Sequence, residues 1–274
     1  MHELGFIGSG NMAEAIVRSA IAAGILKPEQ IIAADPSPER REVLASLGVT
    51  AVDANAEVVA NARQVVLAVK PQAAAGPAAE VGANLRDHHV VISIMAGLST
   101  ARLAEMVRAG APAGGEAKRL RLIRVMPNTP LMVGKGMAGV ALGADAQPGD
   151  DELAMKLLAA GGEAVRVDEA ALDAITAVSG SGPAYLFYLA EAMERAAGEL
   201  GLGKHARLLV SQTLAGAAEL LAQSDDDAAT LRKKVASPGG TTEAALRTLD
   251  QHGVSDALVE AIHAAERRSR ELGG

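Results

Sequence analysis

One late stretch of the sequence, Ser237-Pro238-Gly239-Gly240-Thr241-Thr242, combines backbone freedom with hydroxyl side chains. Pro238 has no backbone N–H to donate, and the two glycines allow conformations that other residues disfavour. Thr241 or Thr242 is expected to cap a helix over about residues 243–249. A helix start offers free N–H groups that suit a carboxylate, and a hydroxyl lies beside them. The stretch therefore predicts either a capped turn between two helices or a cradle for a small anion.

A second stretch, Gly8-Ser9-Gly10-Asn11-Met12-Ala13, has the G-x-G-x-x-A spacing of a dinucleotide-binding turn. It lies between a short apolar run at residues 4–7 and a helical pattern that ends near Gly24, so the order is strand, glycine turn, helix. In such a turn Gly8 makes the tight bend, Gly10 lets a pyrophosphate approach the backbone, and Ala13 lets the helix pack close to the strand.

The next expected strand, residues 31–34, ends in Asp35, about 20 residues past the turn, where a ribose-binding carboxylate is expected. A carboxylate there favours the ribose diol of NAD and repels the 2′-phosphate of NADP. Ser37, Arg40 and Arg41 lie just beyond it and could bind that phosphate. The two arginines could equally be solvated on the first turn of a helix. These residues leave the choice between NAD and NADP open.

Further apolar runs alternate with helical patterns along the first 167 residues. Runs at 65–69, 90–94, 120–126, 137–142 and 165–167 are interpreted as strands, with helices over about 99–107 and 150–160. This alternation predicts a Rossmann-type, doubly wound parallel sheet with helices on both faces. Ligands bind such sheets at the carboxyl ends of the strands. The turns expected there contain Asn55, Lys70-Pro71, Ala96-Gly97 and Asn128-Thr129; each could be an ordinary turn, but together they outline a cofactor crevice.

Two other segments of this half are expected to lie on the surface. Residues 108–118 are rich in alanine and glycine and are interpreted as a loop. The pair His88-His89 is interpreted as a solvated turn, because no acidic or cysteine partner lies at ligand spacing. No metal site is expected.

From residue 168 onward the pattern changes to helices alone, which gives predicted domains over residues 1–167 and 168–274. Helices are expected over about 206–222, 228–235 and 255–270, with another after Pro183. The helix near 206–222 has an apolar surface wider than one stripe. This all-helical domain either buries its apolar surface against a second subunit or forms a self-contained bundle.

Composition narrows the class of protein. The 274 residues carry a net charge of −7 with no long basic run, which argues against a nucleic-acid or anionic-membrane surface. No cysteine is present, so disulfides, a thiol nucleophile and thiolate metal ligands are excluded. The start of the chain does not have the pattern of a signal peptide, and no apolar run approaches the roughly 20 residues of a membrane span. A cytoplasmic protein is expected.

The motifs of both halves, taken together, resemble those of pyrroline-5-carboxylate reductase, the last enzyme of proline synthesis. The resemblance spans most of the chain. It rests on Gly8-Ser9-Gly10-Asn11-Met12-Ala13, Ala68-Val69-Lys70-Pro71, Arg124-Val125-Met126-Pro127-Asn128-Thr129-Pro130, Ser179-Gly180-Ser181-Gly182-Pro183-Ala184-Tyr185 and the stretch at 237–242.

The resemblance implies a dinucleotide domain followed by a helical dimerisation domain that interlocks with a partner. It also implies NADPH as the usual hydride donor, with NADH sometimes used. Together with Ser37 and Arg40 from the ribose argument, the candidate cofactor-binding residues are Ile7, Gly8, Ser9, Gly10, Asn11, Met12, Asp35, Asn55, Ala68, Val69, Lys70, Pro71, Met95, Ala96 and Gly97.

For the substrate, a small cyclic imine carboxylate, the resemblance implies a place between the nicotinamide and the stretch at 237–242, with part of the pocket from the partner. The candidate residues are Ser237, Gly239, Gly240, Thr241, Thr242 and the acidic pair Asp168 and Glu169. Many family members have asparagine where this chain has Lys234, and a cation there could also help to hold a carboxylate.

The chemistry implied is hydride transfer to the carbon of a C=N bond, giving L-proline. The cofactor supplies the hydride, and the protein supplies orientation and electrostatics. A hydroxyl near the ring nitrogen makes the imine a better acceptor, and Thr242 is the candidate catalytic residue.

Two other functions remain open from the sequence. A β-hydroxyacid dehydrogenase shares the fold and the glycine turn but uses a lysine on its interdomain helix, and no lysine occurs here between Leu157 and Gly203. A dinucleotide-binding regulatory protein without catalysis would bind cofactor but would not oxidise it in the presence of an imine.

Overall fold

The computed structural model describes residues 1–112 and 119–273. Its contacts divide the chain into two compact units, Met1–Ser181 with Ala265–Gly274, and Gly182–Ala264. The predicted domain boundary at residues 167 and 168 marks the end of the last strand. The compact units divide later, because Leu172 and Ala177 are buried in the first unit.

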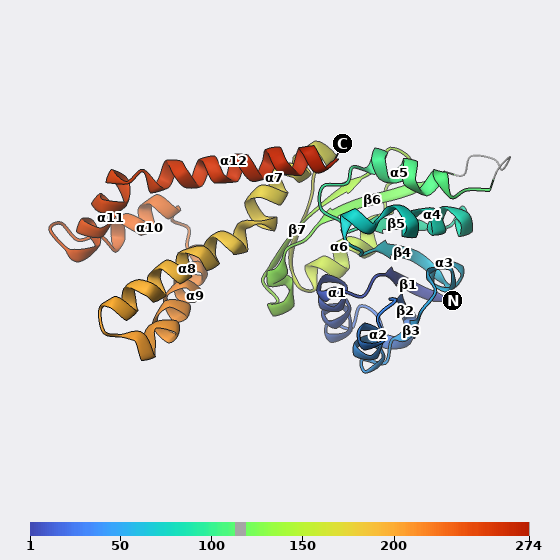
Figure 1. Ribbon diagram of the computed structural model, residues 1–274, viewed down its shortest axis with the longest axis horizontal. Coiled ribbons are helices and arrows are strands. Elements are labelled where there is room, and N and C mark those ends of the chain that lie inside the picture. Colours follow the sequence, from blue (N-terminus) through green and yellow to red (C-terminus); the bar gives the residue numbers. More distant parts are fainter. Residues whose placement is uncertain (113–118, 274) are drawn as a thin grey trace. The chain divides into compact units, whose positions relative to one another are not determined.

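The first unit is built on one sheet with the strand order β3-β2-β1-β4-β5-β6-β7-β8 (Figure 1). The strands are β1 (His2–Ile7), β2 (Ile31–Ala34), β3 (Thr50–Val52), β4 (Ala62–Leu67), β5 (Val90–Ser93), β6 (Arg121–Met126), β7 (Gly136–Leu142) and β8 (Gly162–Arg166). The pairs from β3 to β6 are all parallel. In β1 and β5 every residue but the first two of β1 is buried, as expected of strands covered on both faces.

The strand order reverses at β1, which pairs with β2 on one side and β4 on the other. This is the order of a doubly wound sheet, in which ligands bind at the carboxyl ends of the strands that flank the reversal. Ile7 at the end of β1 pairs with Leu67 at the end of β4, so the two turns that follow these strands begin side by side.

Helices cover both faces of this sheet (Figure 1). One core cluster joins the sheet to α1 (Asn11–Ala22) and α6 (Glu152–Ala159), and the other joins it to α3 (Asn55–Asn61), α4 (Ala75–Asn84) and α5 (Thr100–Ala109). Helix α2 (Pro38–Ala45) adds Leu44 to the first cluster. A Cβ on Gly82 of α4 would collide with the carbonyl oxygen of Val107, so this glycine lets α4 and α5 approach closely. The predicted fold class is confirmed.

Three details of this unit differ from the prediction. Strand β7 runs antiparallel to β6, because only a 3-10 turn (Thr129–Val133) joins them and a parallel return needs a longer crossover. Strand β3 and helices α3 and α4 were not predicted. Helix α5 continues to Ala109, so Arg108 is helical, and residues 113–118 of the predicted loop lie outside the described residues.

The second unit is helical throughout, as predicted. It contains α8 (Gly182–Glu199), α9 (Ala206–Gln223), α10 (Ala228–Lys234), α11 (Thr241–Gln251) and the first part of α12 (Val254–Gly273). Large apolar side chains on these helices are exposed, including Phe187 at 65%, Tyr188 at 78% and Leu208 at 68%. A self-contained bundle would bury such side chains, so this surface fits association with another chain.

Candidate active site

The glycine turn after β1 is shaped by close packing. Gly8 has φ +91, and a Cβ on it would lie 2.9 Å from the carbonyl oxygen of Ala68. Gly10 is the N-cap of α1 in an extended conformation, with no side-chain cap. A Cβ on Gly10 would meet nothing within 4 Å. The start of α1 is therefore open beside Gly10, where a pyrophosphate is expected, and because the N–H groups of a helix start suit an anion, the turn fits a dinucleotide.

Asp35 is fixed by two backbone N–H groups. The Ser9 N–H donates to its Oδ2 at 2.7 Å, and the Ser37 N–H donates to its Oδ1 at 2.9 Å. The Ser9 side chain beside it is buried, and among the described residues its Oγ has no hydrogen-bond partner. The carboxylate thus lies at the glycine turn, where the ribose argument places it.

The two arginines after β2 are tied to the same turn. Arg40 donates from Nε to the Ser9 carbonyl oxygen at 2.6 Å and from Nη2 to Glu14 at 2.9 Å, and Arg41 donates to the Asp35 carbonyl oxygen at 2.7 Å. Hydrogen bonds from Arg18 and Arg40 hold the pKa of Glu14 below its ordinary value. The alternative of two solvated arginines is therefore wrong: both guanidinium groups hold backbone of the ribose region.

The turns after the neighbouring strands complete this edge of the sheet. Ala68 donates its N–H to the Ile7 carbonyl oxygen at 2.9 Å, which joins the turn after β4 to the end of β1. Val69 is half-buried, and Lys70 is exposed before the 3-10 turn Pro71–Ala73. Asn11 and Met12 open α1, and Asn55 is the first residue of α3 and not part of a loop.

The turn after β5, which contains Met95, Ala96 and Gly97, is packed from one side. Met95 is buried, and Gly97 has φ +77. A Cβ on Gly97 would lie 2.8 Å from the Cβ of Leu272, near the end of α12. The last turn of α12 thus packs against this candidate cofactor segment.

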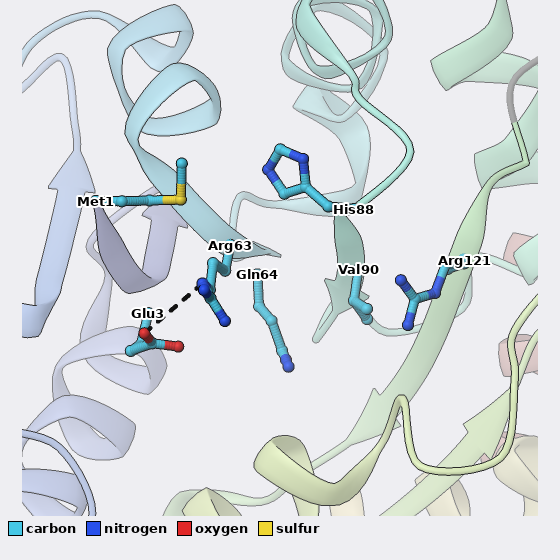
Figure 2. A pocket seen from close by; sticks show the side chains of 7 residues that line it. All are labelled: Met1, Glu3, Arg63, Gln64, His88, Val90 and Arg121. Atoms are coloured by element: carbon cyan, nitrogen blue, oxygen red, sulfur yellow. Dashed lines mark ion pairs between the residues drawn. The ribbon is translucent and has the colours of Figure 1, made fainter.

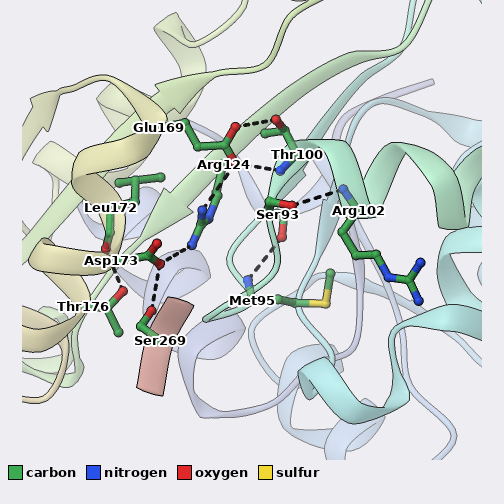
Figure 3. A network of polar contacts seen from close by, with 11 residues as sticks. Ser93, Met95, Thr100, Arg102, Arg124, Glu169, Leu172, Asp173, Thr176 and Ser269 are labelled. Carbon is green, nitrogen blue, oxygen red and sulfur yellow. Dashed lines mark hydrogen bonds and ion pairs between the residues drawn. The ribbon is translucent and has the colours of Figure 1, made fainter. Parts of the chain in front are cut away.

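Glu169 and Asp173 flank a buried arginine beside that turn (Figure 3). The Arg124 side chain, 6% exposed, donates to Glu169 at 3.3 Å and to Asp173 at 3.1 Å. Glu169 also accepts the N–H of Thr100 at 2.6 Å and its hydroxyl at 2.5 Å, and Asp173 accepts the hydroxyl of Ser269 at 2.8 Å. Buried charges need such partners.

This network gives Glu169 partners within the chain, and its predicted contact with the substrate stays a prediction. Glu169 ties the start of α5 to β6, whereas Asp168 is exposed and occupies the N-cap position of the 3-10 turn Glu169–Ala171 without a side-chain cap. The signal that could have revealed the network is Arg124 itself, since an arginine inside a buried strand requires carboxylate partners.

Two of the quoted motifs meet at a segment that the sequence did not predict. Residues Thr176–Gly180 form a π-helix, a rare conformation that is often found at functional sites. Asn128 donates to the Ser179 carbonyl oxygen at 3.0 Å and accepts the Met137 N–H at 2.8 Å. Asn128, expected to open toward the cofactor crevice, is instead 8% exposed and holds the π-helix.

The turn at residues 237–242, which we call the Pro-Gly turn, lies in the second unit. Gly239 has φ +72, and Gly240 is the N-cap of α11 with no side-chain cap. The predicted threonine cap is wrong, because Thr241 and Thr242 are the first two helical residues. Their N–H groups lack intrahelical partners, as at every helix start, so an anion could be bound there.

Two other groups near this turn already have partners. Lys234, at the end of α10, forms an ion pair with Asp226, and its head group is exposed. Ser237 is exposed and accepts the Gly240 N–H on its carbonyl oxygen at 2.9 Å. The Asp226 carboxylate offsets part of the charge that the Lys234 ammonium group could offer a substrate.

At the opposite edge of the sheet, a hollow of about 390 Å³ is lined by Met1, Glu3, Arg63, Gln64, His88, Val90 and Arg121 (Figure 2). Its charged groups are paired: Arg63 lies 3.8 Å from Glu3, and Arg121 binds Asp150. His89 next to it is buried, which corrects the prediction of a solvated turn. Its Nδ1 accepts the Arg86 N–H at 2.9 Å, and burial lowers the pKa of His89 to about 4.

In residues 1–112 and 119–273, no group of three or more His, Asp or Glu side chains is arranged to hold a metal ion. Over the same residues, no helix combines the length and the apolar character needed to cross a membrane.

Sequence comparison extends these local observations to the whole chain. Residues 169–272 match the family described as pyrroline-5-carboxylate reductase dimerisation, and residues 3–97 match the family described as NADP oxidoreductase, coenzyme F420-dependent. Pyrroline-5-carboxylate reductase 2 of Bacillus subtilis is 37% identical over 99% of this chain and 95% of its own length. The chain belongs to the pyrroline-5-carboxylate reductase family. A second relative, the pyrroline-5-carboxylate reductase of Pseudomonas aeruginosa, is 39% identical over 98% of this chain and 96% of its own length.

Solved structures agree with this membership. The Plasmodium falciparum pyrroline carboxylate reductase with NADP bound is similar with a TM-score of 0.87 and 29% identity, covering 100% of this chain and 98% of that one. The Coxiella burnetii pyrroline-5-carboxylate reductase has the same TM-score at 34% identity, covering 100% and 99%.

Family membership confirms the resemblance and the predicted class of enzyme, an NAD(P)H-dependent oxidoreductase that associates through its helical part. A 3-hydroxyisobutyrate dehydrogenase of Mycobacterium tuberculosis shares only the fold, with a TM-score of 0.51 and 15% identity over 82% of this chain and 72% of that one. The β-hydroxyacid dehydrogenase alternative is therefore dropped.

Proposed function

We propose that this chain reduces the C=N bond of 1-pyrroline-5-carboxylate with NADPH and releases L-proline. The observation that best supports the proposal is that this chain, which matches 95% of the length of a Bacillus subtilis reductase, has both helix starts, the open one at Gly10 and the Pro-Gly turn. NADPH supplies the hydride when it is bound, and the protein provides binding, orientation and polarisation.

The proposal assigns the cofactor to the first unit. The N–H groups at the start of α1 would bind the pyrophosphate, with Gly10 leaving it room. Asp35, Ser37 and Arg40 would face the adenosine ribose. Arg40 lies at the turn, and its guanidinium retains N–H donors for a 2′-phosphate. The Asp35 carboxylate, which would repel that phosphate, already accepts two backbone N–H groups, so Arg40 favours NADPH over NADH.

The start of α3 and two turns would hold the rest of the cofactor. They contain Asn55, the segment from Ala68 to Pro71, and the segment from Met95 to Gly97. The Gly97 side of the last turn is packed against Leu272, so the cofactor would contact the other side.

The substrate carboxylate is assigned to the Pro-Gly turn of the second unit. The N–H groups of Thr241 and Thr242 would donate to it, with Lys234 as an added cation. The Thr242 hydroxyl would donate to the ring nitrogen and so draw electrons from the C=N carbon that accepts the hydride. Asp168, exposed beside Glu169, remains a candidate substrate contact.

We also expect the enzyme to act in the cytoplasm.

The test is to incubate the purified chain with NADPH and pyrroline-5-carboxylate, and to follow NADPH absorbance and L-proline by chromatography. The proposal predicts that one L-proline forms for each NADPH oxidised. NADPH binding without L-proline would instead support the regulatory protein without catalysis.

A further inference from the structure

The Pro-Gly turn already binds a carboxylate, and that carboxylate belongs to the chain itself. Glu243, the third residue of α11, accepts the Gly239 N–H on its Oε2. Its other oxygen, Oε1, lies 3.4 Å from Nη2 of Arg247, one helical turn further along. A negative charge of this chain thus lies against the backbone assigned to the substrate's negative charge.

This contact changes which donors of the turn are available. The Gly239 N–H is taken by Glu243, and the Gly240 N–H donates to the Ser237 carbonyl oxygen at 2.9 Å. The N–H groups of Thr241 and Thr242 remain for a ligand. An incoming carboxylate would bind there next to the Glu243 carboxylate, and like charges at such short range repel.

The position of the contact differs from an ordinary helix cap. In a capping box, the third helical residue accepts the N–H of the N-cap residue, which here is Gly240. Glu243 instead accepts the N–H of the residue before the N-cap, Gly239, whose φ is +72. Arg247 offsets the charge only weakly, because both side chains are substantially exposed, 66% for Arg247 and 45% for Glu243.

We propose that Glu243 competes with the substrate carboxylate for the Pro-Gly turn and thereby raises the KM for the imine. The inference rests on the proposed function, because it takes the turn as the carboxylate site. Glu243 does not contact the reacting atoms in this account. It sets how tightly an anionic ring binds, and a neutral residue at this position makes the turn a better anion site.

The first test is Glu243→Gln, with Asp250→Asn as the matched control. The glutamine keeps an oxygen that can accept the Gly239 N–H and removes the charge. Asp250 is exposed on the same helix, one residue before the helix ends at Gln251, and its replacement changes the net charge equally. We expect the KM for the imine to fall about fivefold in Glu243→Gln, with kcat changed less than twofold and the control KM within about twofold of the parent enzyme.

A second variant separates the charge from the hydrogen bond. Glu243→Ala removes both, so the Gly239 N–H becomes free for the ligand, and its KM should fall at least as far as in Glu243→Gln. Arg247→Gln leaves the Glu243 charge without its partner, and its KM should rise up to about twofold. A KM in Glu243→Gln that is unchanged, raised, or lowered no more than in Asp250→Asn overturns the inference.

Binding without turnover provides the readout that distinguishes this failure from failure of the proposed function. L-Proline is titrated by calorimetry into each variant with NADP⁺ present, and its dissociation constant should fall in Glu243→Gln in parallel with KM. If the parent enzyme is active and the Glu243 variants have the same KM for the imine and the same dissociation constant for L-proline, only this inference is contradicted. If the parent chain oxidises neither NADPH nor NADH in the presence of the imine, the proposed function itself is contradicted.

Discussion

Helices α1 and α11 begin in the same way but in different surroundings. Each has a glycine N-cap in extended backbone, Gly10 with φ −64 and Gly240 with φ −82, and neither has a side-chain cap. Each follows a glycine of positive φ, Gly8 or Gly239. A Cβ on Gly8 would collide with the Ala68 carbonyl oxygen, whereas a Cβ on Gly239 would meet nothing within 4 Å.

The two proposed anion sites differ in the contacts that hold their backbone in place. The start of α1 is held by the sheet, by buried Ser9 and by Asp35, and its acidic residue Glu14 is paired with arginines. The Pro-Gly turn is held by hydrogen bonds among its own residues and Glu243. Changes at the first site should therefore alter cofactor binding, and changes at the second should alter substrate binding and turnover.

The largest effect is expected from Gly10→Val. A valine side chain would fill the open space at the start of α1 and exclude the pyrophosphate. The dissociation constant of NADPH, measured by fluorescence titration, should rise at least about 100-fold with Tm little changed. Gly76→Val, also with open space around its Cβ, is the control for the added side chain. Normal NADPH binding by Gly10→Val would mean that the cofactor does not use this helix start.

Thr242→Ala should act on the other site alone. Loss of the hydroxyl removes the proposed donor to the ring nitrogen, and kcat should fall about 50-fold while the NADPH dissociation constant stays the same. Thr248→Ala is the control, because its hydroxyl bonds to the Ala244 carbonyl oxygen further along α11. Equal turnover in Thr242→Ala and Thr248→Ala would remove Thr242 from the mechanism.

Acid should weaken the sheet that supports the first site. His89 is neutral when buried, and its pKa is lowered by burial to about 4, below its ordinary value of 6.5. Because the unfolded chain takes up the proton first, stability is lost as the pH falls from about 6.5 toward 4. The free energy of unfolding should drop by on the order of 2 kcal/mol more between pH 7 and 4.5 in the parent than in His89→Gln.

Urea titrations at the two pH values measure this difference. His88→Gln, which removes the exposed neighbour, should keep the full acid sensitivity. If His89→Gln is as sensitive to acid as His88→Gln, the buried imidazole is not the cause.

The smallest effect is expected from Gly239→Ala. Alanine at a φ of +72 costs about 1 kcal/mol, and with no atom within 4 Å the turn can relax instead of unfolding the unit. The KM for the imine should rise about fivefold with NADPH binding unchanged. Gly253→Ala, at φ +63 and also in open space, carries the same strain outside the turn. A similar KM change in both variants would assign the effect to general destabilisation.

Features with a local signal were predictable from the sequence. The glycine turn, the strand that ends in Asp35 and the change to helices after residue 167 each depend on residues close together in the chain, and the structure has all three. The antiparallel β7 and the π-helix at Thr176–Gly180 depend on partners far away, such as Asn128, and no local pattern specifies them.

Charged side chains show the same limit. Glu169 and Lys234 were candidates for the substrate, yet their present partners are Thr100 with Arg124, and Asp226. A carboxylate or an ammonium group can serve a ligand or a neighbouring residue equally well, and only tertiary structure distinguishes the two. Glu243 was absent from the predicted site for the same reason, because its contact depends on how the Pro-Gly turn folds back.

The most direct test of the central claim is a steady-state assay of NADPH and NADH oxidation with pyrroline-5-carboxylate, with a six-membered cyclic imine carboxylate as control. The account predicts oxidation that depends on the five-membered imine, with a higher kcat/KM for NADPH than for NADH because Arg40 lies at the ribose end of the glycine turn. Measurable binding of NADPH with no oxidation of NADPH or NADH in the presence of the imine would contradict the account.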